Sequence, residues 1–215
     1  DEFAIEEALK IRERKPDAEI ILISLGPECF RDTLRVGLAM GADRAIHLID
    51  PLFDETDSLT KAYLLAKAAN FLGFDLILCG RQAVDDDMAQ IGPALAVYLK
   101  ISCITVVTKL EFLKDWSKAV ATRQIEGGSE IIESKLPVVL TCQKGLNQPR
   151  LPSLKGIMSS KKKKIEVFDA NKLSFLPLEE NASKSTFTQM GLSLPSRRGK
   201  GKFIDGSTDD AVTKL

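Results

Sequence analysis

The sequence predicts an α/β fold: a doubly wound, mostly parallel sheet with a small antiparallel extension and a long C-terminal arm. Three observations support this fold class. Up to residue 100, continuous apolar runs alternate with helical segments of about a dozen residues, which is typical of a parallel sheet covered on both faces. Short strand-like runs then follow one another without helices between them. Beyond Cys142 the chain is long, irregular and contains several prolines.

The first element is a helix that begins at once. Apolar residues recur at Phe3, Ile5, Leu9 and Ile11, and acidic residues occupy the first turn, where the helix dipole favours negative charge. A natural chain normally has residues before such a helix. We therefore expect a preceding strand that this sequence lacks, together with any site residue on it.

The parallel core follows in regular alternation. The first strand ends in a glycine turn, and Gly41 is a stop signal for the next helix. Buried strands are predicted at 18–26, 44–50 and 74–80, and helices at 27–41, 58–72 and 90–100. Helices between parallel strands predict a doubly wound core.

After residue 101 the pattern becomes antiparallel. Strands are predicted at 103–112, 119–126, 129–133 and 137–142, with a glycine-rich hairpin turn over 126–129. The chain thus divides into an α/β core with its extension at 1–145, a loop and basic segment at 146–168, and an arm at 169–215 that ends in a short helix at 208–215. An arm of this length without a core of its own is expected to wrap a partner.

Composition argues against several classes of protein. The 215 residues carry 30 basic and 30 acidic side chains, so bulk charge does not favour nucleic acid. No apolar run approaches the roughly 18–20 residues that span a bilayer. The four cysteines lie far apart without a CxxC pair, which argues against a zinc or iron–sulfur site and suits reduced thiols in a cytosol or matrix. The single histidine, His47, lies in an apolar strand, where a solvated or hydrogen-bonded side chain is expected rather than a catalyst.

The richest candidate site is the loop 79–93, which follows the third predicted strand and opens a helix. Ligands in open α/β sheets bind beyond the carboxyl ends of the strands. Gly80 permits close approach of the backbone, and the amides near 88–91 are suited to a phosphate. The loop matches neither GxGxxG nor the P-loop pattern. A nucleotide phosphate site and an acidic loop that only caps the helix are both open interpretations.

Three consecutive carboxylates, Asp85, Asp86 and Asp87, complicate this loop. They would repel a phosphate unless they turn outward or accept hydrogen bonds from sugar hydroxyls or backbone amides. Carboxylates also suit divalent cations. Consecutive side chains in an extended loop point in different directions, however, so a cation site is not favoured.

A second candidate site precedes the lysine run 161–164. Apolar Leu154, Ile157 and Met158 lie just before the four lysines. An exposed apolar anchor beside a positive patch suits docking on an acidic protein surface, with charge steering the encounter. The alternative is a solvated basic loop without a partner.

In this order and spacing, the segments resemble the β subunit of electron transfer flavoprotein over nearly the whole chain. The stretches that carry the likeness are 1–8, 37–47, the loop 79–93, 136–137, 146–150, and 157–158 followed by the lysine run and 165–166. Family members begin with an additional strand and loop, which agrees with the expected preceding segment.

The resemblance implies a Rossmann-like fold of the adenine nucleotide α-hydrolase type and a heterodimer with a homologous α subunit. Together the subunits carry electrons from dehydrogenases, often acyl-CoA dehydrogenases, to a membrane quinone oxidoreductase or another acceptor. The redox FAD is held mainly by the α subunit, and the β subunit commonly holds a structural AMP. The family likeness therefore implies an electron carrier without catalytic residues or a metal, in a bacterial cytoplasm or, alternatively, a mitochondrial matrix.

The same resemblance implies two sets of site residues. Leu154 is expected to be the apolar anchor of a recognition loop, and Ile157, Met158 and Lys162 to lie beside it at the partner contact. Contacts to the nucleotide are expected from Asp1, Leu25, Gly80, Arg81, Gln82, Ala83, Val84, Asp85, Asp86, Asp87, Met88, Ala89, Gln90 and Ile91. Of these, Ala83, Asp86, Asp87, Ala89 and Gln90 carry the most weight.

Two departures from the family pattern favour AMP over a second FAD. In electron-bifurcating relatives the β subunit binds a second FAD that takes hydride from NADH, and threonines are expected where Met88 and Lys61 stand here. Their replacement removes two hydroxyls able to bond a pyrophosphate. A bifurcating subunit and a free-standing adenine-nucleotide-binding module are the alternatives to the carrier.

Overall fold

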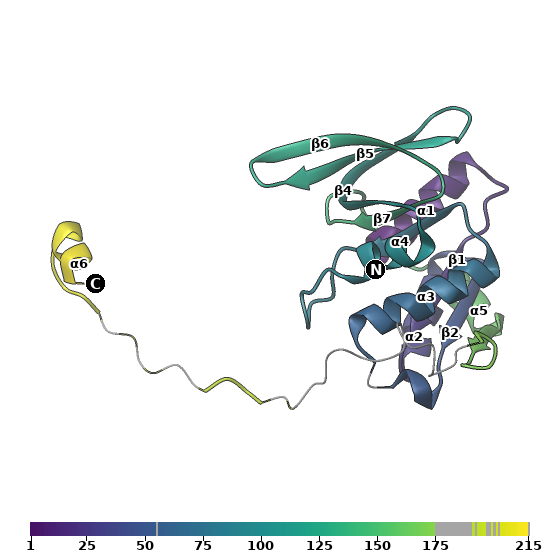
Figure 1. Ribbon diagram of the computed structural model, residues 1–215, viewed down its shortest axis with the longest axis horizontal. Helices are drawn as coiled ribbons and strands as arrows, with labels where there is room; N and C mark the ends of the chain where they lie inside the picture. Colours follow the sequence, from purple (N-terminus) through teal and green to yellow (C-terminus); the bar gives the residue numbers. More distant parts are fainter. Residues whose placement is uncertain are drawn as a thin grey trace.

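The computed structural model describes residues 1–54, 56–174, 191, 193–196, 199, 201 and 203–214. Within these residues the chain forms an α/β structure whose strands belong to two sheets, one of three strands and one of five (Figure 1). The predicted parallel core is present, divided between these two sheets.

The three-stranded sheet is entirely parallel. Its strands are β1 (Ile21–Leu25), β2 (Arg44–Leu48) and β8 (Ile165–Phe168), in the order β1-β2-β8. Ile46 pairs with Ile23 on one side and Glu166 on the other. The expectation of irregular structure after Cys142 is therefore wrong for 165–168. Four residues after a lysine run give too short a pattern to indicate a strand, and the partner β2 lies more than a hundred residues earlier.

The five-stranded sheet combines the parallel core with the antiparallel extension. Its order is β3-β7-β4-β5-β6, and β3, β7 and the start of β4 are parallel while β4, β5 and β6 are antiparallel. The strands are β3 (Leu76–Gly80), β7 (Val138–Cys142), β4 (Ser102–Phe112), β5 (Lys118–Ile125) and β6 (Gly128–Lys135). Ile125 pairs with Gly128, so the turn is Glu126-Gly127, within the predicted turn at 126–129. The hairpin of β5 and β6 extends away from the helices (Figure 1).

Helices cover both faces of the two sheets, as a doubly wound fold requires. Alternate residues of β2 point to opposite faces: Ala45 packs with Leu9 of α1, and Ile46 packs with Leu64 of α3. Both α1 and α3 also pack on the five-stranded sheet, so they join the two sheets. The helices are α1 (Glu2–Arg14), α2 (Phe30–Met40), α3 (Ser58–Leu72) and α4 (Ile91–Leu99).

One edge of β1 and one edge of β3 pair with no strand in the described part of the chain. Every residue of these two strands is partly exposed, whereas β7 is buried throughout. The strands β1 and β3 were predicted to be buried, but in the structure they are only partly buried.

Two short helices lie between the strands of the described structure, and a third lies near the C-terminus. A 3-10 turn at Pro51–Phe53 follows β2, and α5 (Leu154–Lys162) precedes β8. The helix α5 corrects the expectation of a loop at this position. Its start has a local signal, since the Ser153 hydroxyl accepts a hydrogen bond from the Gly156 amide and caps the helix.

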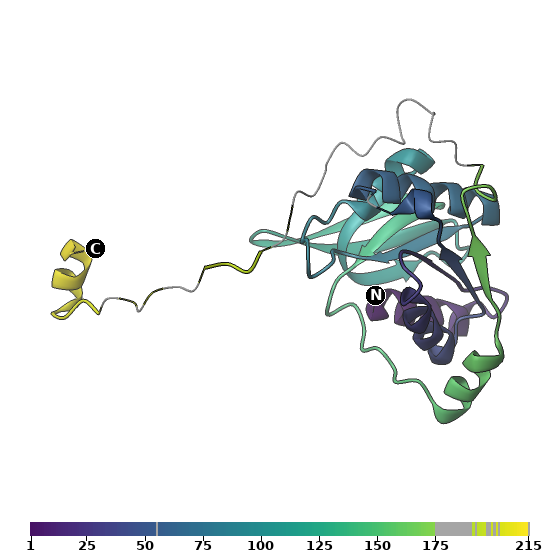
Figure 2. The same ribbon diagram turned by 90° about the horizontal axis from the view of Figure 1, so that it is seen from below.

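The C-terminal arm is described only in part. The terminal helix α6 (Thr208–Lys214) is present where it was predicted, and Figures 1 and 2 show it apart from the main body. Much of the predicted arm, including 175–190, lies outside the described residues. Across the helices that the structure describes, none is long and apolar enough to cross a bilayer.

Candidate functional site

The loop between β3 and α4 lies at the carboxyl end of the parallel strands. Arg81, its first residue, donates its amide to the carbonyl of Cys142 at 3.1 Å, which places the loop beside the end of β7 as well. In sheets of this kind, loops at the carboxyl ends of the strands form the ligand sites. The side chains of residues 81–88 are exposed, and Val84 is 99% exposed, so the loop is open to solvent.

The helix α4 begins without a side-chain cap. Its first residues follow Gln90, whose side chain makes no capping hydrogen bond, whereas the side chains of Asp1, Asp57 and Ser153 cap α1, α3 and α5. The amides of Ile91 and Gly92 therefore point out of the helix toward the loop. The helix has nine residues, and the free amides at its uncapped start are suited to bind a negatively charged ligand.

The three carboxylates of the loop bind within the loop itself. Asp85 accepts a hydrogen bond from the Asp86 amide at 3.0 Å, and Asp86 accepts one from the Met88 amide at 3.0 Å. Asp87 accepts one from the side-chain nitrogen of Gln82 at 2.7 Å. Each of the three carboxylates thus has a different hydrogen-bond partner. Within the described chain there is no group of three His, Cys, Asp or Glu side chains able to hold a metal ion.

The backbone turns sharply before α4. Asp87 and Ala89 have φ angles of 52° and 53°, in the left-handed region that few residues other than glycine adopt. Gly92 lies directly on the sheet, because a Cβ there would be 2.4 Å from the Thr141 methyl and 3.2 Å from the Cys79 sulfur. The start of α4 is thus pressed against β7 and β3.

Two residues expected at the site come from other elements. Asp1 accepts a hydrogen bond from the Ala4 amide at 2.8 Å, and its carboxylate lies over Gly80, where a Cβ would be 2.8 Å from Oδ2. The group that approaches the Gly80 backbone in this structure is therefore Asp1. Leu25 ends β1 and pairs with Leu48, so it lies on the other sheet.

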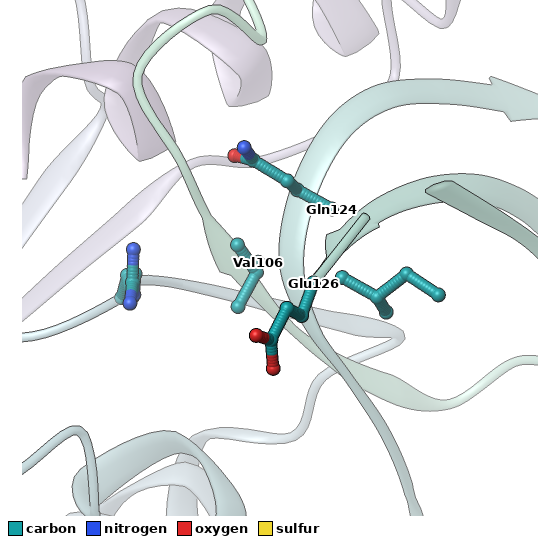
Figure 3. A pocket seen from close by; sticks show the side chains of 5 residues that line it. Val106, Gln124 and Glu126 are labelled. Atoms are coloured by element: carbon teal, nitrogen blue, oxygen red, sulfur yellow. The ribbon is translucent and has the colours of Figure 1, made fainter. Parts of the chain in front are cut away.

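A cavity that the sequence did not indicate adjoins Arg81. Its volume is about 250 Å³, and it is lined by Arg81, Val106, Gln124, Ile125 and Glu126. Figure 3 shows Val106, Gln124 and Glu126 around it. Val106 lies at an irregularity of β4 with a φ of 59°, and its amide donates to the Thr141 hydroxyl at 2.9 Å. The pairing of β4 with β5 brings Val106 beside Gln124, and the end of β3 places Arg81 there, so no local sequence signal could have found this site.

His47 is hydrogen-bonded, one of the two arrangements expected for it. Its side chain is fully buried, and Nε2 lies 2.9 Å from the Gly26 carbonyl. Burial also raises the pKa of the Cys79 and Cys142 thiols to about 12, so neither thiol is a nucleophile at neutral pH. All four cysteines are free.

The second candidate site is the exposed side of α5. Leu154, Met158 and Lys162 are spaced four residues apart and so follow one face of the helix. Leu154 is 82% exposed and Met158 68% exposed, and Ile157 is also exposed. A groove of about 400 Å³ is lined by Lys155, Met158, Ser159 and Lys162. Lys155 and Ser159 were not among the predicted residues, although the helical period places them beside the others.

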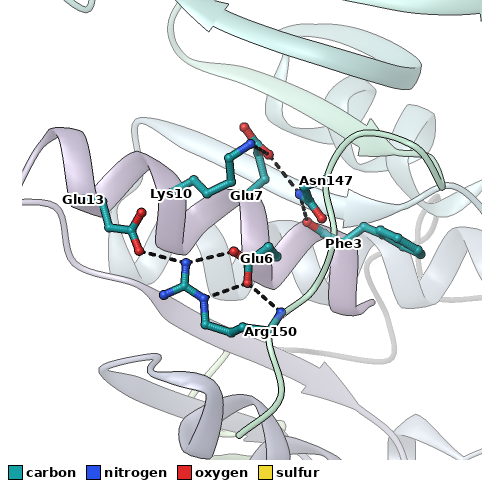
Figure 4. Close-up of polar contacts among 7 residues, drawn as sticks. All are labelled: Phe3, Glu6, Glu7, Lys10, Glu13, Asn147 and Arg150. Carbon is teal, nitrogen blue, oxygen red and sulfur yellow. Dashed lines mark hydrogen bonds and ion pairs between the residues drawn. The ribbon is translucent and has the colours of Figure 1, made fainter.

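The segment that leads to α5 is fastened to α1. The guanidinium of Arg150 binds both carboxylate oxygens of Glu6 at 2.8 Å and also Glu13 at 2.8 Å (Figure 4). Asn147 donates to the Phe3 carbonyl and to Glu7, each at 2.9 Å. The hydrogen bonds that Arg150 donates lower the pKa of the Glu6 carboxyl, and the same bonds to Glu6 and Glu13 raise the pKa of Arg150. The roles of Glu6 and Glu13 were not predicted, because their partners lie more than 130 residues away.

The comparisons with known proteins agree with this architecture. Residues 1–173 match the model of the electron transfer flavoprotein domain. The chain belongs to the electron transfer flavoprotein family. The electron transfer flavoprotein β subunit of Thermoanaerobacterium thermosaccharolyticum is 40% identical over the whole chain and 82% of that relative.

Further relatives give the same result. The one from Bos taurus is 38% identical over the whole chain and 81% of that relative. The CarD subunit of the caffeyl-CoA reductase–Etf complex of Acetobacterium woodii is 38% identical over 99% of the chain and 80% of that relative. The resemblance to electron transfer flavoprotein β subunits is confirmed, and with it a role in electron transfer as a carrier subunit rather than a classical enzyme.

Proposed function

We propose that this chain is the β subunit of a heterodimeric electron transfer flavoprotein with AMP bound at the loop between β3 and α4. The α subunit holds most of the redox FAD, and the dimer carries electrons from dehydrogenases such as acyl-CoA dehydrogenases to a quinone oxidoreductase or similar acceptor. The observation that carries the nucleotide assignment is the uncapped start of α4 beneath an exposed loop whose own carboxylates are occupied.

The internal hydrogen bonds of the loop remove the main objection to a phosphate. Asp85 and Asp86 accept backbone amides, so part of their charge is compensated before a ligand arrives. The amides of Ile91 and Gly92 supply donors at the positive end of α4. Leu25, Ala83, Ala89 and the other predicted contact residues surround the nucleoside in this proposal.

A mononucleotide suits the site better than a second FAD. The Met88 sulfur lies 3.6 Å from the Ser58 hydroxyl at the start of α3, so the Met88 side chain spans the space between the loop and that helix. A pyrophosphate extending in this direction would have to displace it. Lys61, also on α3, has no hydroxyl to offer.

The exposed side of α5 is the docking surface for the electron donor. Leu154 and Met158 supply the apolar anchor, and Lys155 and Lys162 surround it with positive charge. This combination suits an acidic protein surface with an apolar pocket. The C-terminal arm wraps the α subunit, and the complex works in the bacterial cytoplasm or the mitochondrial matrix.

The bound nucleotide provides the test. The chain co-expressed with its α subunit should release one AMP and contain one FAD per heterodimer, measured by mass spectrometry and flavin absorbance. Changing Gln90 and Asp87 to alanine should reduce AMP content and lower Tm, because a ligand that binds only the native state stabilises it. Asp17→Ala, before β1 at the other end of the strands, is the matched control.

Two other results would overturn the assignment. Two flavins per heterodimer without AMP would identify the second-FAD, bifurcating alternative. A stable monomer with nucleotide but no affinity for an α subunit would identify a free-standing nucleotide-binding module. The CarD relative is named as a subunit of a complex with caffeyl-CoA reductase, so an acyl-CoA-type oxidoreductase is the first partner to assay.

A further inference from the structure

The proposed docking helix α5 is not held in place by packing of its apolar side chains. Of its nine residues only Ser160 is buried, and the apolar residues Leu154, Ile157 and Met158 all face solvent. Helices shorter than about 12–15 residues are marginal on their own in water. Contacts other than the usual apolar face must therefore fix α5.

The first of these contacts is a close approach of two backbones. A Cβ at Gly156 would lie 2.2 Å from the carbonyl oxygen of Ala39, so α5 rests directly on the end of α2. At the far end of α5, the Lys163 ammonium donates to the Ala42 carbonyl at 2.6 Å. Both contacts place α5 along the C-terminal half of α2.

The third contact is a single guanidinium that closes the end of α5. Nη1 of Arg35, on α2, donates to the carbonyls of both Ser160 and Lys163. The Ser160 carbonyl also accepts the amide of Lys163, the residue that follows the helix, at 3.2 Å. Carbonyls at the end of a helix carry its negative dipole. Arg35 therefore supplies a hydrogen-bond donor to both carbonyls and places a positive charge at this end of the helix.

We infer that Arg35 is a positioning residue for partner docking: it fixes the orientation in which α5 presents Leu154 and Met158. This inference rests on the proposed docking function of α5. Because polar and backbone contacts to α2 hold α5, its apolar side chains are left uncovered for a partner. The hydrogen bonds of Arg35 go to the carbonyls of Ser160 and Lys163 at the end of α5, and not to Leu154 or Met158.

The test uses the full chain in complex with its α subunit and an acyl-CoA dehydrogenase as electron donor. Arg35→Ala should raise the KM for the carrier about tenfold, the equivalent of one lost charge-assisted hydrogen bond, and leave kcat unchanged. Flavin content and the rate of reduction by dithionite should stay at the level of the unaltered protein. Hydrogen exchange at the amides of 157–163 should accelerate, and Arg35→Lys should restore part of the KM.

Arg31→Ala is the matched control. Arg31 lies one turn earlier on α2 and pairs with Glu28 on the surface at 2.7 Å, so its removal should change neither KM nor exchange in α5. If Arg35→Ala loses the α subunit or flavin, Gly156→Ala gives a second reading of the same contact, with the same expected rise in KM.

The outcomes distinguish failure of the positioning role of Arg35 from failure of the docking function of α5. A raised KM in Leu154→Ala with an unchanged KM in Arg35→Ala would overturn the positioning role and leave α5 as the docking site. An unchanged KM in Leu154→Ala would overturn the docking function, and the positioning role with it.

Discussion

Glu6 is a carboxylate whose environment differs sharply from that of an ordinary surface acid. Its side chain is 6% exposed, and it receives hydrogen bonds from the amide and the side chain of Arg150. These bonds hold its pKa below the ordinary value of 4.5. The folded protein thus binds the proton of Glu6 more weakly than the unfolded chain does. Its contribution to stability is present in full above pH 4.5 and is lost as the pH falls through the lower, folded pKa.

Glu6→Gln should lower the free energy of unfolding at pH 7 by about 2 kcal/mol, less than for a fully buried pair because Arg150 is 40% exposed. The variant should also lose stability less steeply than the unaltered protein below pH 4.5. Urea unfolding at a series of pH values measures both effects. Glu13→Gln is the control, since Glu13 is 58% exposed and its bond to the same Arg150 should contribute less than about 1 kcal/mol. Parallel pH curves for Glu6→Gln and the unaltered protein would refute the assignment.

The helix α5 is the element whose surface and function are most closely connected. Leu154→Ala should slow electron transfer from a dehydrogenase about tenfold by raising the KM for the carrier, because it removes an apolar anchor. Flavin content should be unchanged. Val97→Ala, on α4, removes a 74% exposed apolar side chain from another surface and should have no effect on the same steady-state assay. Lost flavin together with normal docking in Leu154→Ala would contradict the proposal.

The elements differ in how far the sequence alone could define them. The helix at 58–72 was predicted with the observed ends, because Asp57 caps it and Gly73 ends it. The strands of the core were predicted within two or three residues, since each is a continuous apolar run. The helix α5 and the strand β8 were missed because they depend on contacts with α2 and β2, more than a hundred residues earlier.

The parts of the candidate site also differ in how far the sequence alone could predict them. The loop after β3 could be proposed from topology and the helix start at Gln90, which are local features. The cavity beside Arg81 could not, because Val106 and Gln124 meet there only through the pairing of β4 with β5. The direction of each loop carboxylate likewise required coordinates, since three consecutive aspartates are compatible with several arrangements.

The whole molecule depends on helices shared between its two sheets. Leu9 of α1 packs with the three-stranded sheet, while Phe3 and Ile11 of the same helix pack with the five-stranded sheet. Trp116 reports on the latter, because its ring stacks 4.8 Å from that of Phe112 in β4. A helix common to both sheets should make them unfold together.

Leu9→Ala should therefore destabilise both sheets by about 2–5 kcal/mol, the usual cost of a large-to-small change in a core. The unfolding midpoints from Trp116 fluorescence and from far-ultraviolet circular dichroism should shift equally. Val36→Ala, at an exposed position of α2, is the control and should shift neither. A Trp116 midpoint that stays in place while the dichroism midpoint falls would mean that the two sheets unfold independently.

The unpaired edges of β1 and β3 have a consequence for how this chain behaves in concentrated solution. Each edge offers a row of unpaired backbone donors and acceptors flanked by isoleucine and leucine side chains. Neither strand has a proline or a charged residue, which would disfavour pairing with another strand. An extended apolar segment can add to such an edge through backbone hydrogen bonds, as unpaired strand edges allow.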